Sequence, residues 1–84
     1  MNDALFLHDI RDIPFNIYIK TLTGKTVSIT VKPYDTIADV KMILENVIGI
    51  STDKQRLLFE GKDLNDKNIV SDYGIGNNFI LHFA

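Results

Sequence analysis

The stretch that decides the fold is Lys54-Gln55-Arg56-Leu57-Leu58-Phe59-Glu60-Gly61-Lys62-Asp63-Leu64. Its side chains alternate in character at a period of two, which is typical of a half-buried strand; Leu57 and Phe59 are predicted to face a core and Leu58 to face water. Gly61 tolerates a positive φ and so predicts a tight turn, after which the chain returns to a buried Leu64. A leucine on the outer face of a strand, with basic residues on either side, indicates a surface that binds a partner.

The chain before this stretch predicts a hairpin. Two alternating runs favour strands whose inward sets are Phe15, Ile17 and Ile19, then Val27, Ile29 and Val31. Leu22-Thr23-Gly24 between them predicts a turn that leaves Leu22 exposed at its tip. Pro33 cannot donate to a continuing ladder and ends the second strand.

A helix follows, with its boundaries marked in the sequence. Thr36 is a suitable N-cap and Gly49 a suitable C-cap, so the helix is expected to begin at Ile37 and end before Gly49. Its predicted buried stripe is Ile37, Val40, Leu44 and Ile48. Ile50 is expected to pack back onto the core, whereas Ile43 and Val47 widen the apolar area beyond the stripe.

The last strand is expected over residues 79–84, with Leu81 and Phe83 pointing in and Ile80, His82 and Ala84 pointing out. Ile80 is expected beside Tyr18 on an adjacent strand, either as a second exposed contact or as a simple cross-strand pair. The order of elements predicts an α+β fold, with a mixed sheet of four to five strands packed on one helix.

Several motifs in one register resemble the ubiquitin family. They are Lys20-Thr21-Leu22-Thr23-Gly24-Lys25-Thr26, Asp35-Thr36-Ile37, Gln55-Arg56-Leu57-Leu58-Phe59 with Gly61-Lys62, Ser71-Asp72-Tyr73 and Leu81-His82. The resemblance spans residues 15–84, which we expect to be a ubiquitin-like domain, and it implies the β-grasp fold. It also implies that the Tyr73 hydroxyl ties down its loop and that Lys41 pairs with Asp66. Residues 1–14 lie outside it and are expected to be a flexible N-terminal extension.

The resemblance also implies a hydrophobic surface patch that helical ubiquitin-binding domains grip. Its matching positions are Leu22, Leu58, His82 and Ala84. Gly61 permits close backbone approach, and Arg56 with Lys62 is expected to form a positive rim that favours acidic partners. With Ile80 added, the expected partner-binding residues are Leu22, Arg56, Leu58, Gly61, Lys62, Ile80, His82 and Ala84.

Composition argues against several functions. The formal net charge of −2 over 84 residues gives no basic field for nucleic acid or for a membrane surface, and no apolar run is long enough to span a bilayer. There is no cysteine, so no disulfide or thiolate site, and we expect a cytoplasmic or nuclear protein. His8 and His82 fall on separate segments, and no catalytic, phosphate-binding or metal-binding motif is present. We therefore expect no enzyme activity, no cofactor and no metal.

Two functions of different class remain open. The first is an interaction domain, part of a larger protein, that docks ubiquitin-binding or proteasome-pathway partners. The second is a ubiquitin-like modifier, or its precursor, whose Gly-Gly tail is missing from these residues. Lys62, which matches the family's chief chain-linking lysine, fits either a role in the binding rim or an ordinary surface charge. A further hypothesis is that Leu5, Phe6 and Leu7 cover the flank of Ile43 and Val47, in cis or in a swapped dimer.

Overall fold

The computed structural model describes residues 13–84, which contain five strands and one α-helix. In chain order they are β1 (Phe15–Lys20), β2 (Thr26–Val31), α2 (Ile37–Ile48), β3 (Leu57–Phe59), β4 (Lys62–Asp63) and β5 (Ile80–Phe83). Two short 3₁₀ helices, Thr52–Lys54 and Val70–Tyr73, lie in the connections. No helix in this part of the chain is long and apolar enough to cross a membrane.

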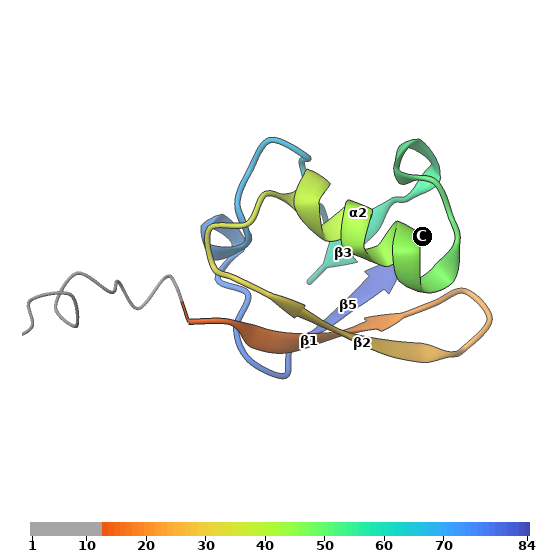
Figure 1. The fold of residues 1–84 in the computed structure, drawn as a ribbon, viewed down its shortest axis with the longest axis horizontal. Coiled ribbons are helices and arrows are strands. Elements are labelled where there is room, and N and C mark those ends of the chain that lie inside the picture. Colours follow the sequence, from red (N-terminus) through yellow and green to blue (C-terminus); the bar gives the residue numbers. More distant parts are fainter. Residues whose placement is uncertain (1–12) are drawn as a thin grey trace, which may run out of the picture.

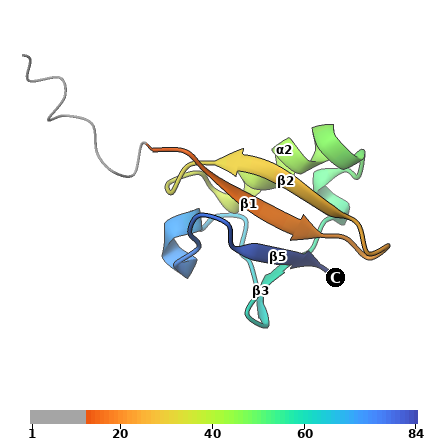
Figure 2. The same cartoon turned by 90° about the horizontal axis from the view of Figure 1, so that it is seen from below.

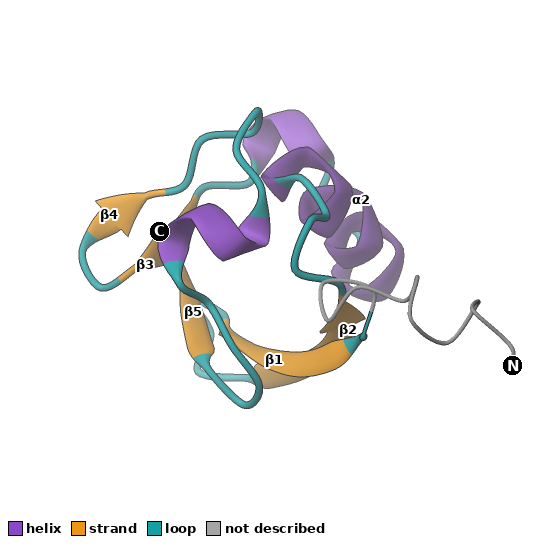
Figure 3. Ribbon diagram, turned by 90° about the vertical axis from the view of Figure 1, so that its left-hand side faces the viewer, coloured by secondary structure: helices purple, strands orange, loops and turns teal. Residues whose placement is uncertain are grey.

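The strands form one mixed sheet in the order β2-β1-β5-β3-β4. The central strands β1 and β5 are parallel, and every other neighbouring pair is antiparallel. α2 crosses one face of this sheet, and the other face is open (Figures 1 and 2). Figure 3 shows β2 and β4 at opposite edges. This is the β-grasp fold, as predicted.

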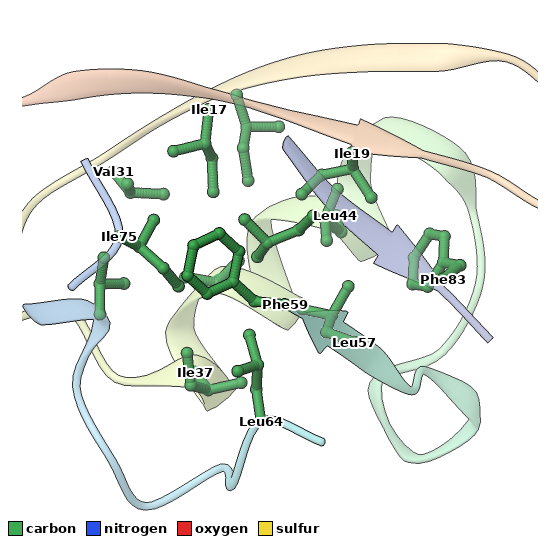
Figure 4. Close-up of a cluster of buried hydrophobic side chains, with 14 residues drawn as sticks. Ile17, Ile19, Val31, Ile37, Leu44, Leu57, Phe59, Leu64, Ile75 and Phe83 are labelled. Carbon is green, nitrogen blue, oxygen red and sulfur yellow. The ribbon is translucent and has the colours of Figure 1, made fainter. Parts of the chain in front are cut away.

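The core lies between α2 and the sheet. Most inward positions of the strands are buried as the alternation predicts: Ile17, Ile19, Leu57 and Leu81 are each at most 1% exposed. Phe15 and Val27, also predicted to face inward, are partly buried and pack against this core. Figure 4 shows Ile37 and Leu44 from α2 pointing toward the side chains of Ile17, Leu57 and Phe59 from the strands. Removing these side chains from water is the main favourable contribution to folding.

Both predicted helix caps are present. The Thr36 side chain accepts a hydrogen bond from the Asp39 N–H (3.0 Å), and the Asp39 carboxylate accepts one from the Thr36 N–H (3.1 Å). At the other end Gly49 adopts a left-handed conformation (φ 78°) and its N–H donates to the Glu45 carbonyl. These bonds satisfy backbone groups that the helix itself leaves unpaired and fix its limits at Ile37 and Ile48.

The long connection between β4 and β5 is held by polar contacts. The Tyr73 hydroxyl accepts hydrogen bonds from the Asn65 N–H (2.8 Å) and the Asn68 side-chain amide (3.0 Å), which confirms its predicted role. The Lys41 ammonium lies 2.6 Å from the Asp66 carboxylate, so the predicted pair is also present.

The deciding stretch holds a shorter strand than its alternation suggests. Only Leu57–Phe59 is extended and paired as β3, and Lys54 belongs to the preceding 3₁₀ helix. Gln55 is buried outside any strand, and it links its loop to the helix region. Its side-chain amide donates to the carbonyls of Lys41 in α2 (2.8 Å) and of Ile50 just after α2 (2.9 Å). The last strand is also shorter than expected, because the Phe79 N–H donates to the Gly76 carbonyl in the turn before β5. The ring of Phe79 stacks on that of Phe59, with the ring centroids 5.8 Å apart.

One expectation about the helix flank is wrong. Ile50 does not pack onto the core and is 41% exposed, because the left-handed turn at Gly49 directs the chain away from it. Of the two residues that widen the apolar area, Ile43 packs against the core, whereas Val47 is 52% exposed. The hypothesis that Leu5, Phe6 and Leu7 cover this flank concerns residues outside the described part of the chain.

Candidate interaction surface

One row of side chains crosses the open face of the sheet. Register pairs Lys20 of β1 with His82 of β5, His82 with Leu58 of β3, and Leu58 with Asp63 of β4. Directly paired residues lie on the same face of a sheet, about 4.5–5.5 Å apart. We call these four residues the Leu58 row. Leu58, half buried between His82 and Asp63, is its apolar member.

Three other predicted residues lie at the end of the sheet where β1 and β5 terminate. The Ala84 N–H donates to the Arg56 carbonyl (3.0 Å), which places Ala84 beside Arg56. Arg56 itself lies two residues before Leu58 in the chain. Leu22 is 77% exposed at the tip of the β1–β2 turn, as predicted, and lines a groove together with Ala84. The structure therefore brings Leu22, Arg56 and Ala84 to one border of the Leu58 row.

Tyr18 and Ile80 form a second row on the same face. They are direct partners in the parallel β1–β5 pairing, as expected, and Ile80 is 51% exposed. Each lies two residues before a member of the Leu58 row on its own strand. The apolar surface of the sheet thus extends from Leu58 toward Ile80.

Gly61 lies in the β3–β4 turn at the far edge, and Lys62 is the first residue of β4. Glu60 (φ 52°) and Gly61 (φ 78°) both have positive φ, the signature of a two-residue type I′ hairpin turn. Lys62 pairs with Phe59, so its side chain starts on the opposite face of the strand from Leu58. Lys62 is thus an edge residue and is not part of the row.

The charge of the predicted positive rim differs from expectation. Arg56 donates from Nε to Asp63 Oδ1 (2.7 Å) and from Nη2 to Asp63 Oδ2 (2.8 Å), a bidentate ion pair on the surface. These hydrogen bonds and the guanidinium charge lower the pKa of Asp63 below its ordinary range and raise the pKa of Arg56. The charge of Arg56 is thus balanced by Asp63, whereas Lys62 forms no ion pair with any residue in the described range 13–84.

Asp63 is not among the partner-binding residues predicted from the sequence, and its ion pair with Arg56 is a feature that only the structure reveals. A two-residue turn at Glu60 and Gly61 pairs residue 58 with residue 63, and residue 56 then lies diagonal to 63, within reach of a long side chain. The length of the turn therefore indicates the ion pair of Arg56 with Asp63, but only through the cross-strand register that the turn sets.

Residues 13–84 contain no cluster of side chains that could hold a metal ion. The open face presents the apolar side chains of Leu58 and Ile80 with charged side chains beside them.

The fold and this open face define a ubiquitin-like domain. A model of the ubiquitin family matches residues 17–84, and the chain belongs to that family. Domains of this family are generally non-catalytic.

Two similar proteins are matched over most of their length. The chain is 39% identical over 68 residues to the NEDD8-like protein RUB1 of Saccharomyces cerevisiae, covering 81% of this chain and 88% of that protein. It is 41% identical over 68 residues to the ubiquitin-like protein NEDD8 of Dictyostelium discoideum, with the same coverage of both chains, 81% and 88%.

A third relative is a much larger protein. The chain is 33% identical over 67 residues to the E3 ubiquitin-protein ligase parkin of Drosophila melanogaster, covering 80% of this chain but only 14% of that protein. The family therefore includes both small proteins and domains of long chains among the relatives of this sequence.

Proposed function

We propose that the ubiquitin-like domain is a non-catalytic docking module for proteins of the ubiquitin or proteasome pathway. The observation that carries this function is the position of Leu58 at the open face of the sheet. The apolar residues Leu22, Ala84 and Ile80 lie around the Leu58 row. Such a partner would place the protein in the cytoplasm or the nucleus.

The partner that fits best is a small helical domain with an exposed apolar helix. Leu58 offers the central contact, and Leu22, Ile80 and Ala84 offer apolar contacts around it. A surface of this size buries less than ~1,200 Å², the range of transient complexes. We expect a Kd of roughly 10 to 500 μM, with Leu58 contributing the largest loss on truncation.

The experiment is a titration of the ¹⁵N-labelled chain with a ubiquitin-associated helical domain, followed by chemical-shift changes. We expect shifts at Leu58, His82 and Ala84, and a loss of about 2 kcal/mol of binding free energy in Leu58→Ala. The matched control is Met42→Ala on the exposed side of α2, 58% exposed, which should bind as the parent chain does. Unchanged binding by a folded Leu58→Ala variant would refute the assignment.

A ubiquitin-like modifier is the second candidate, and one observation favours it. The chain matches 88% of the length of the two NEDD8-related proteins, as a small protein of the same kind would. The two functions differ in the endogenous protein: its intact mass and C-terminal peptide would reveal either a continuation into further domains or a terminus of Gly-Gly.

A further inference from the structure

The outer edge of β2 has no strand beside it among residues 13–84. β2 lies at one end of the sheet, with β1 as its neighbour (Figure 3). An exposed strand edge offers unpaired N–H and C=O groups to any further strand, and proteins usually protect such edges with charge or by keeping them short. The opposite edge is protected in both ways, because β4 consists only of the charged residues Lys62 and Asp63. β2 is six residues long and carries no charge.

The hydrogen bonds of β1 show which residues of β2 face this outer edge. The Tyr18 N–H donates to the Phe79 carbonyl (2.9 Å), on the β5 side and away from β2. Bonded and non-bonded pairs alternate along an antiparallel ladder, so Tyr18 and its register partner Ser28 form a non-bonded pair. The N–H and C=O of Ser28 therefore point to the outer edge, as do those of Thr26 and Thr30, two residues away on either side. All three side chains are exposed.

This edge is complementary to a second copy of itself. If the two strands run antiparallel with Ser28 opposite Ser28, then Thr26 of each copy lies opposite Thr30 of the other. Each of these pairs exchanges both of its N–H···O bonds, so two-fold symmetry satisfies every outward N–H and C=O of the three residues. On the outer face the hydroxyl side chains of the two copies meet, a pairing that stabilises antiparallel strands.

Hydrogen bonds within the chain favour this register over its neighbours. A register centred on Thr26 would need the N–H of Gly24, which already donates to the Thr21 carbonyl (3.0 Å). One centred on Thr30 would need the N–H of Lys32, which already donates to the Asp35 carboxylate (2.8 Å). Only the register centred on Ser28 uses groups that these bonds leave available.

Charge also favours a second copy as the occupant. Lys25 and Lys32 flank β2, and in the register centred on Ser28 they lie opposite the uncharged residues Val31 and Gly24 of the other copy. No like charges are therefore directly opposed. β2 itself offers no charge by which a foreign strand would be selected.

We propose that two copies of the chain associate through β2, as a symmetric antiparallel pair centred on Ser28 that joins their sheets. This association goes beyond the proposed docking function and does not depend on it, because β1 and β5 separate β2 from the strand that carries Leu58. One strand pair makes a small interface, so we expect a transient dimer with a Kd on the order of 0.1–1 mM.

The test is sedimentation velocity of the full 84-residue chain, at concentrations from well below to well above the expected Kd. Ser28→Lys places like charges opposite each other and should weaken association at least about tenfold, and Ser28→Glu should do the same. An equimolar mixture of the two variants should associate at least as strongly as the parent chain, because opposite charges then face each other. Asn65→Lys is the matched control, since it adds the same charge beyond β4 at the opposite edge, and it should change association by less than about twofold.

Nuclear magnetic resonance tests the register directly. Val27 and Ile29 of the other copy would form a non-bonded pair with Cα atoms about 4.5 Å apart, so mixed labelled chains should show an intermolecular contact between their Hα protons. The Ser28 and Thr30 amides should exchange rapidly in dilute solution and more slowly as the concentration rises.

Four results would overturn the assignment. The first is a chain that stays monomeric at every concentration. The second is an equal loss of association in Ser28→Lys and Asn65→Lys, or no recovery in the mixture of Ser28→Lys and Ser28→Glu. The third is intermolecular contacts confined to the Leu58 row, which would place the association on the docking face. The fourth is slow exchange of the Ser28 and Thr30 amides at all concentrations, which would show that a segment of the same chain occupies the edge.

Discussion

Arg56 and Asp63 close a bidentate ion pair at 2.7 and 2.8 Å on the border of Leu58. Asp63 is the register partner of Leu58, and Arg56 precedes Leu58 by two residues on the same face. A partner that approaches Leu58 therefore meets an exposed ion pair of zero net charge and not an unpaired guanidinium. This relationship changes what the surface selects for.

Asp63→Asn should strengthen binding of an acidic helical partner by several-fold. The substitution releases the Arg56 charge, so the local net charge of Arg56, Asp63 and Lys62 rises from +1 to +2, and charged rims act mainly through the association rate. The check is a titration at low and at high salt, since the gain should shrink as salt screens it. Glu45→Gln on α2 removes a negative charge away from the sheet face and should give no comparable gain.

The ion pair also predicts a pH dependence of stability. Because hydrogen bonds from Arg56 hold the pKa of Asp63 below its ordinary value of 3.8, the pair stabilises the folded state above that pH. Its contribution is lost as the pH falls through the lowered pKa. The check is a double-mutant cycle of Arg56→Gln and Asp63→Asn in thermal unfolding. The coupling between the two sites should be measurable at neutral pH and absent in strong acid; coupling that persists in acid would contradict this account.

Lys41 and Asp66 should respond unequally to substitution. The Lys41 side chain is only 9% exposed, whereas that of Asp66 is 57% exposed. Asp66→Ala leaves a nearly buried ammonium without its partner and should cost roughly 1–3 kcal/mol of unfolding free energy. Lys41→Met keeps the packing of the stem and leaves a solvated carboxylate, so its cost should be smaller. Chemical denaturation measures both, and the reverse order would show that the stem packing dominates.

Gln55 should be among the most sensitive polar positions. Its amide donates to the Lys41 and Ile50 carbonyls, so Gln55→Ala leaves two acceptors without that donor, at about 1–3 kcal/mol for a buried one. Gln55→Glu has the same shape but a carboxylate that cannot donate. Burial raises the pKa of such a carboxyl, so this variant should become more stable as the pH falls and the group is protonated. An unfolding midpoint in Gln55→Glu that does not rise toward mild acid would contradict this role.

Much of the fold follows from local sequence because its signals are local. The alternation in Phe15–Lys20 and Thr26–Val31 and the caps at Thr36 and Gly49 depend only on neighbouring residues, and the structure confirms them. The limits of β3 depend on which residues find partners in β4 and β5, which no local pattern states.

The candidate surface divides in the same way. The exposure of Leu22 could be predicted from the hairpin turn that holds it. The outward-facing residues of β5 could be predicted from the alternation of apolar and polar side chains along the strand. The ion pair of Arg56 with Asp63 depends on cross-strand register, and the exposure of Ile50 depends on the direction the chain takes after Gly49. Both are tertiary relationships between residues that carry no distinctive signal one at a time.

The parallel pairing of β1 with β5 has a consequence for how the chain reaches its native state. These two central strands come from opposite ends of the domain, so Ile19 meets Leu81 only when nearly all of it has been synthesised. Closing so large a loop is entropically costly and is typical of slow-folding topologies. During translation the hairpin of β1 and β2 would wait with an unpaired edge until β5 leaves the ribosome. A ribosome-bound chain that ends before Ile80 should therefore be open to proteases and chaperones, and one in which residues 80–83 have emerged should become resistant in a single step.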